Sequence, residues 1–203
     1  MAWKFYKPDP DEVKIATTIA GLGVATHGRT AALRIGADPY DLISLTYDST
    51  IAKWVSEAVL IPVNAIGATM AANAYEGLSG GTQTPCHISN FKRKYDAGLR
   101  PQVQITFCAY AAAGTPNAYL GLGLNEYTSG DTAIVELGTQ EGAVFDGGAV
   151  ALSTSAKWFA TDWLPANMNA PAEAHVEVSP QGKVSASTMT VLRMAINWRW
   201  VSA

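Results

Sequence analysis

The chain has 203 residues, a formal net charge of −3, and 15% charged side chains against 48% hydrophobic ones. This length allows one large domain or two small ones, and it buries enough surface to be stable without disulfides or metals. A surface with so few charges causes little electrostatic repulsion between molecules. A low charge of this kind is typical of a surface that other subunits cover, and an ordinary neutral β-protein is the alternative. The short basic run Lys92, Arg93 and Lys94 is predicted to be a solvated loop, and nothing else resembles a nucleic-acid-binding patch.

Residues 1–12 are aromatic at first and then rich in proline and aspartate, which predicts an extended N-terminal arm. Trp3, Phe5 and Tyr6 are candidates for contacts with a neighbouring subunit, and folding back into the core is the alternative. The start of the chain does not have the pattern of a signal peptide, and no apolar stretch is long enough to span a membrane, so no membrane partner is expected.

The first third of the chain reads as short strands. Residues 13–20 are rich in β-branched side chains and predict a strand, as do residues 30–36 and 41–47 on either side of a turn cluster. The glycines of residues 21–28 lack the spacing of a nucleotide-binding loop and are better explained by a bend or bulge.

A six-residue phrase occurs twice. Residues 49–54 read Ser-Thr-Ile-Ala-Lys-Trp and residues 153–158 read Ser-Thr-Ser-Ala-Lys-Trp, so five of six positions agree. Each copy predicts a strand, over 51–61 and 156–164, that carries a tryptophan inward and is ended by a proline, which cannot donate to a sheet ladder. This repeat indicates either two related halves of the chain or the same local structure used twice, and a chance match is the alternative.

The middle of the chain continues this pattern. Residues 65–75 could form one short helix, but residues 102–110 alternate apolar and polar side chains with the period of a half-buried strand. Residues 118–124 and 132–137 alternate likewise, and residues 114–117 between the first two strands predict a hairpin turn.

The chain closes on two further strands, 172–178 and 188–201. The last is the clearest, and we expect it to lie inside a sheet. One face is predicted to hold Leu192, Met194, Ile196, Trp198 and Trp200. About ten strands with frequent turn signals predict an all-β fold, an antiparallel β-sandwich of the jelly-roll type. We expect a single domain over 13–203, with a split near 95–100 as the alternative.

No pattern of residues predicts catalysis, a cofactor or a metal. The best carboxylate pair for a glycosidase is Glu57 and Asp162, at similar places in the two echoed strands, although solvated strand carboxylates explain them better. No nucleophile motif is present. The candidate metal ligands do not have the spacing of a zinc site; they are Cys86, His87, Cys108, His27 and His175. We therefore expect a protein that is not an enzyme.

Two cysteines and six tryptophans remain to be placed. Cys86 and Cys108 could form a disulfide, but buried free thiols are favoured. Most tryptophans, including Trp158, occupy positions typical of a core. Trp163 falls on the opposite face from Trp158 and is the candidate for a surface or ligand contact.

The order of these strands resembles a known group of proteins. The chain resembles the small β-sandwich and single jelly-roll structural proteins of phages and viruses. The resemblance rests on four features in order: an aromatic strand ending in Leu-Pro, the strand Gln-Ile-Thr-Phe-Cys-Ala-Tyr at 104–110, a hairpin into a Gly/Leu strand, and a long aromatic closing strand. The resemblance covers roughly residues 40–203 and includes capsid, decoration and fibre proteins.

That resemblance implies a virion protein, assembled in the host cytoplasm, that associates with itself as a trimer or a larger symmetric assembly and with other virion proteins. It implies no catalytic residue and no direct contact with nucleic acid. The first alternative is a carbohydrate- or receptor-binding sandwich, for which a glycan would be the partner. A jelly-roll glycoside hydrolase is a second alternative, and it is less favoured.

Overall fold

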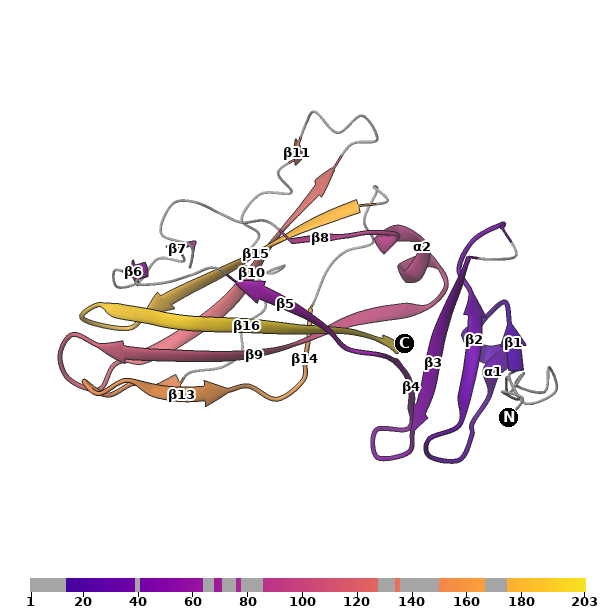
Figure 1. Cartoon of the computed structure of the whole chain (residues 1–203), viewed down its shortest axis with the longest axis horizontal. Coiled ribbons are helices and arrows are strands. Elements are labelled where there is room, and N and C mark those ends of the chain that lie inside the picture. Colours follow the sequence, from indigo (N-terminus) through magenta and orange to yellow (C-terminus); the bar gives the residue numbers. More distant parts are fainter. Residues whose placement is uncertain are drawn as a thin grey trace, which may run out of the picture. The chain divides into compact units, whose positions relative to one another are not determined.

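The fold is described from a computed structural model, which consists mainly of β-strands (Figure 1). The structure describes residues 14–38, 41–63, 68–70, 76–77, 86–127, 134–135, 150–166 and 175–203. These residues divide into two compact units. The smaller unit takes its described residues from 14–57, 93–100 and 200–203, and the larger unit takes the rest.

The smaller unit is built on four strands that follow one another in the sheet. They are β1 (Lys14–Ala16), β2 (Thr30–Arg34), β3 (Leu42–Asp48) and β4 (Lys53–Ser56). β1 runs parallel to β2, whereas β2, β3 and β4 are antiparallel. The predicted strand 13–20 is therefore only partly correct, because it ends at Ala16 and is followed by a short helix, α1 (Ile19–Leu22), whose first turn is capped by Thr18.

Alternate residues of these strands form the core of the smaller unit. Ala31, Leu33, Leu45, Tyr47 and Trp54 are all buried. The intervening residues lie on the opposite face, as expected from the two-residue period of a strand. One face of this sheet is thus apolar and the other is polar.

The helix α2 (Phe91–Asp96) contradicts the prediction of a solvated loop at 92–94. Arg93 forms an ion pair with Asp41 at 2.8 Å, and the ammonium of Lys94 lies 5.4 Å from the centre of the Trp200 ring. Gly98 follows the helix with φ +89°, a conformation that glycine adopts without steric cost, and its carbonyl accepts a hydrogen bond from the last residue of the chain.

The larger unit contains two sheets. In the first, β16 (Met189–Ser202) pairs with β9 (Leu99–Ala111), and β9 pairs in turn with β13 (Lys157–Ala160). Two short strands also pair with β16, namely β5 (Val59–Val63) and β6 (Ala68–Met70), and β14 (Leu164–Pro165) pairs with β9. The long C-terminal strand therefore lies inside a sheet, as the sequence predicts.

The second sheet is centred on an antiparallel pair, β10 (Asn117–Tyr127) with β15 (His175–Val184). Four short strands extend it: β7 (Glu76–Gly77), β8 (Cys86–Ile88), β11 (Ile134–Val135) and β12 (Val150–Ala151). Two sheets agree with the predicted sandwich, but these pairings do not establish a jelly-roll order, and the parallel pair in the smaller unit is not a jelly-roll feature. The sixteen strands among the described residues are more numerous than the roughly ten predicted.

Several local predictions are corrected by the pairing. Pro62 lies within β5 and does not end the strand, which is tolerated because this short strand pairs with β16 only, whereas β14 does end at Pro165. Residues 114–117 connect β9 in one sheet to β10 in the other, so they do not form a hairpin. Residues 68–70 form β6, so the helix predicted over 65–75 is wrong there; the remainder of that segment lies outside the described residues.

Among the residues whose burial is described, the two long strands of the first sheet supply most of the core of the larger unit. On β9, Val103, Ile105, Phe107 and Ala109 are fully buried, as their alternation predicts. On β16, Ile196 and Trp198 are buried on the predicted face, but further back Val191 is buried in place of Leu192. The alternation thus changes phase near the middle of the strand.

Candidate functional site

The two copies of the echoed phrase lie in opposite environments. Trp54, in the first copy, is 3% exposed; its indole nitrogen donates to the Gly23 carbonyl at 2.7 Å, and its ring meets Tyr47 edge-on at 5.4 Å. Trp158, in the second copy, is 62% exposed. The prediction that Trp158 belongs to a core is therefore wrong, and the phrase marks a surface site in its second copy.

Trp158 lies on an edge strand. In the part of the chain that the structure describes, β13 pairs with β9 and with no other strand. Thr161, just beyond β13, donates its N–H to the Ile105 carbonyl at 2.9 Å. Because backbone groups alternate along an antiparallel ladder, those of Phe159 face β9 and those of Trp158 and Ala160 face away from it. A large exposed aromatic side chain and outward-facing backbone groups thus occupy the same edge, which we call the β13 edge.

Trp163, the surface candidate of the sequence, is half-buried beneath a cation. The guanidinium of Arg199 lies 4.1 Å from the centre of its ring. The same guanidinium donates two hydrogen bonds to Gln102 Oε1, at 3.0 and 2.8 Å. Beside them, Asn197 donates to Gln104 at 3.2 Å. The flat ring that a sugar would need is therefore already occupied by Arg199, and Trp158 is the exposed indole.

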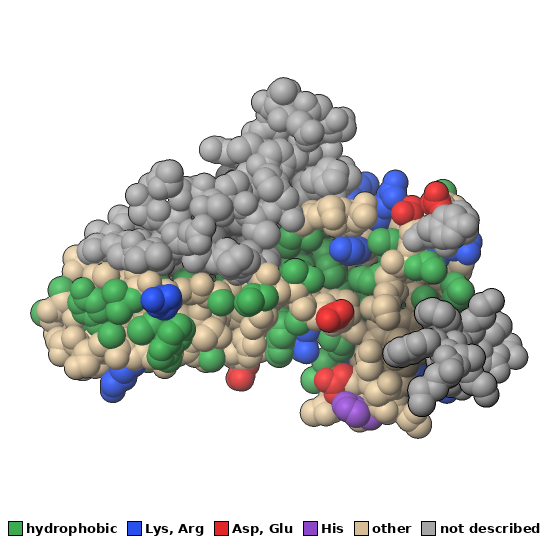
Figure 2. Space-filling model, in the orientation of Figure 1, with side chains coloured by type: hydrophobic (Ala, Val, Ile, Leu, Met, Phe, Trp, Pro, Cys, Tyr) green, Lys and Arg blue, Asp and Glu red, His purple; other side chains and the backbone are tan. Residues whose placement is uncertain are grey.

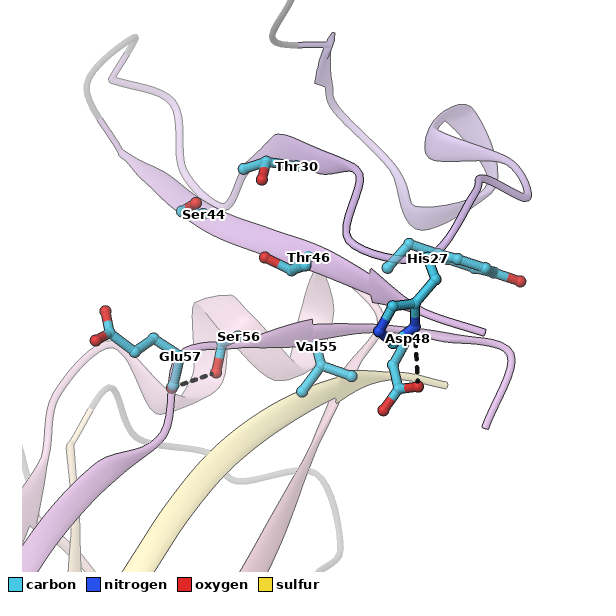
Figure 3. A pocket seen from close by; sticks show the side chains of 9 residues that line it. His27, Thr30, Ser44, Thr46, Asp48, Val55, Ser56 and Glu57 are labelled. Carbon is cyan, nitrogen blue, oxygen red and sulfur yellow. Dashed lines mark hydrogen bonds and ion pairs between the residues drawn. The ribbon is translucent and has the colours of Figure 1, made fainter. Parts of the chain in front are cut away.

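A polar hollow lies on the outer face of the smaller unit (Figure 3). It has a volume of about 520 Å³, and we call it the hydroxyl hollow. Its floor follows from the register of three strands: Thr30 on β2 pairs with Thr46 on β3, which pairs with Val55 on β4. Ser44 lies on β3, two residues before Thr46, and Glu57 directly follows the last residue of β4. Neighbouring strands therefore present their hydroxyls side by side.

His27 and Asp48 form one end of the hydroxyl hollow. His27 Nδ1 lies 3.6 Å from Asp48 Oδ1 and accepts a hydrogen bond from the Ser49 N–H at 3.2 Å. The same carboxylate accepts the Thr50 N–H at 2.9 Å. Nδ1 is therefore engaged within the protein, and Nε2 is the ring nitrogen that remains for a ligand. Figure 3 shows Glu57 at the other end of the hollow.

Two lining residues have structural roles. Ser56 accepts a hydrogen bond from the Trp200 N–H at 2.9 Å and donates to the Glu57 carbonyl at 3.0 Å. Tyr47 is 4% exposed and packs against Trp54. The groups that remain for a ligand are those on the outer face of the sheet.

The structure describes only some of the catalytic and metal candidates, because the side chains of Cys86, His87 and His175 lie outside the described residues. Glu57 belongs to the smaller unit and Asp162 to the larger one. Among the described residues, no three His, Cys, Asp or Glu side chains are close enough to hold a metal ion. Cys108 is a buried free thiol, so it is not bridged to Cys86.

The interface candidates Trp3, Phe5 and Tyr6 lie outside the described residues. No helix in the described part of the chain is long and apolar enough to cross a membrane.

Sequence reasoning did not find the hydroxyl hollow. Its signal was present as the alternating hydroxyls of Thr30, Ser44 and Thr46, but strand register alone shows that these side chains are neighbours. Sequence reasoning also placed Trp158 in a core, although its indole is the more exposed of the two, because both Trp158 and Trp163 fit either face of a short strand.

Comparisons with known proteins give little further guidance. No family model matches the chain, and no curated protein matches it. Among solved structures, the chain is similar to a chain of infectious bursal disease virus strain Gt, with 9% identity, a TM-score of 0.39, and coverage of 82% of this chain and 41% of that one. For strain Gx the values are 7%, 0.40, 85% and 42%. This chain thus spans about two fifths of those viral chains, and likenesses at these TM-scores do not establish a shared fold.

Proposed function

We propose that this chain is a structural subunit of a virus particle, of the capsid, decoration or fibre type, and that it acts by burying its surface against other subunits. The observation that carries the proposal is the β13 edge, where Trp158 is 62% exposed. Subunit interfaces are enriched in exposed aromatic side chains, and a free strand edge is a template for pairing with another chain.

The surface of the larger unit supports this proposal. Leu60 and Val59 on β5 are 60% and 61% exposed. On the face drawn in Figure 2, the surface over β16 and β13 is mostly hydrophobic or uncharged, with few Lys, Arg, Asp or Glu side chains. Single exposed apolar residues are ordinary, but several on one weakly charged unit are typical of a surface that is covered in an assembly.

The partners under this proposal are further copies of the chain and other virion proteins, and the place of action is the virion. A closed symmetric homo-oligomer is the expected form. The N-terminal arm, residues 1–12, supplies a second contact through Trp3, Phe5 and Tyr6. The proposal assigns no catalytic residue, cofactor or metal.

The test is the mass of the purified full chain, measured by light scattering, for the wild type and for Trp158→Lys. We expect the wild type to form a discrete oligomer or particle and Trp158→Lys to form smaller species, because a charge at the β13 edge opposes pairing. Val24→Lys is the matched control, since Val24 is 89% exposed in the smaller unit. Circular dichroism confirms that both variants are folded.

Two results would overturn the proposal. A wild type that remains monomeric at its highest soluble concentration argues against an assembly protein. An assembly that is unchanged in Trp158→Lys, or equally weakened in Val24→Lys, shows that the β13 edge is not the interface.

A further inference from the structure

We infer that the hydroxyl hollow of the smaller unit is a binding site for a neutral saccharide unit. The site is separate from the β13 edge, and it needs no assembly of the chain. Its volume of about 520 Å³ lies within the range of roughly 300–1,000 Å³ that is usual for small-molecule sites.

The floor of the hollow matches the chemistry of a polyol. Thr30, Ser44 and Thr46 lie on two adjacent strands and point into the same space (Figure 3). No hydrogen bond from these three hydroxyls to another described residue is formed. Each hydroxyl can donate one hydrogen bond and accept two, as can each hydroxyl of a sugar ring. A row of such groups therefore satisfies a ligand whose own groups both donate and accept.

The two ends and the wall of the hollow add complementary groups. Glu57 is exposed at one end and offers two carboxylate oxygens, which can accept hydrogen bonds from neighbouring sugar hydroxyls. His27 at the other end has a second ring nitrogen, Nε2, which is not engaged by Ser49 and can form a hydrogen bond with a sugar hydroxyl. Val55 supplies an apolar contact for the C–H face of a sugar ring.

The charges of the hollow argue against an anionic ligand. Its lining includes Asp48 and Glu57 and neither lysine nor arginine. Phosphate, sulfate or an acidic sugar would meet two carboxylates without a compensating cation, so electrostatic repulsion would oppose binding.

The spacing of the carboxylates argues against a bound cation. By continuation of the β3–β4 register, Glu57 lies opposite Ser44, and Asp48 is four residues further along β3. At about 3.3 Å per residue, this separates the two carboxylates by roughly 13 Å, too far to share one ion. Asp48 is, moreover, already engaged by the Thr50 N–H.

The test uses the full chain and a panel of methyl glycosides of common neutral monosaccharides, with glycoside binding detected by saturation-transfer NMR and all probes followed through the protein resonances of Thr30 and Thr46. Sialic acid, inorganic phosphate and calcium chloride are included as charged probes. We expect at least one neutral glycoside to bind weakly and the charged probes to leave the resonances of Thr30 and Thr46 unchanged.

Substitutions then locate the binding. Thr46→Val keeps the shape of the side chain and removes one hydroxyl, so we expect an affinity about 5- to 10-fold lower, the effect of losing one hydrogen bond. Glu57→Gln should also weaken binding. Thr17→Val is the matched control, because Thr17 is exposed in the same unit and does not line the hollow.

The inference is wrong if no glycoside binds, if a charged probe binds instead, or if Thr46→Val and Thr17→Val have equal effects. None of these results depends on the oligomeric state, so failure here and failure of the assembly proposal are distinguishable.

Discussion

The echoed phrase provides a matched pair of substitutions, Trp54→Ala and Trp158→Ala. The local sequence is almost the same at both sites, yet Trp54 is 3% exposed and Trp158 is 62% exposed. We expect Trp54→Ala to destabilise the smaller unit strongly and Trp158→Ala to change stability little. Comparing the two variants measures how much burial of the tryptophan side chain contributes to the free energy of unfolding when the local sequence is nearly the same.

The magnitude follows from the buried area. The two indoles differ by about three fifths of a tryptophan surface, roughly 150 Å², which at about 25 cal/mol per Å² amounts to about 4 kcal/mol. This agrees with the roughly 3–5 kcal/mol usual for Trp→Ala in a core. Loss of the hydrogen bond to Gly23 adds about 1 kcal/mol at most, because Gly23 is exposed and water can replace the indole. For Trp158→Ala we expect a change within about 0.5 kcal/mol.

The assay is urea unfolding followed by NMR signals from each unit, so that loss of the smaller unit is seen separately from loss of the larger one. Trp54→Ala should lower the unfolding midpoint of the smaller unit, while Trp158→Ala leaves both midpoints near the wild-type values. Equal destabilisation by the two substitutions would show that the opposite burial assigned to the two tryptophans is wrong.

Two further predictions concern single cations. Arg199→Lys should destabilise the larger unit by about 1–2 kcal/mol in urea unfolding, because a lysine cannot both stack on Trp163 and form two hydrogen bonds to Gln102. Arg193→Lys, at an exposed position, is the control. An equal loss of stability in both variants would contradict the role of the stacking contact. Burial lowers the pKa of Lys94 in the folded protein below its ordinary value of 10.5. At a pH between the folded pKa and 10.5, the unfolded chain therefore binds more protons than the folded one, and the free energy of unfolding should rise as the pH rises toward 10.5. Lys94→Met should flatten that rise in unfolding free energy, and an unchanged slope would show that Lys94 is not its source.

The sequence predicted the β-rich class because alternation is a local property. Residues 102–110 show the period of a strand directly, and burial along β9 follows this period except at Cys108, which is buried as well. The strands at 30–36 and 41–47 were predicted from another local signal, the turn cluster between them. The long closing strand was correctly placed inside a sheet because a strand of this length normally pairs on both sides.

Other predictions failed where only pairing could decide. The basic run at 92–94 reads as a solvated loop, but α2 forms there and Lys94 lies against Trp200. Residues 114–117 have the composition of a turn, and composition cannot tell a hairpin from a connection between sheets. The hydroxyl hollow exists because β2, β3 and β4 align Thr30 with Thr46.

The sequence by itself therefore determined that most of the chain forms strands and, along β9, which alternate side chains share a buried face. The tertiary structure alone decided which face is covered, as the two echoed phrases show: Trp54 is buried and Trp158 lies on an open edge. The physical reason is that the period of a strand is fixed by its own backbone, whereas burial depends on neighbours that are distant in the chain.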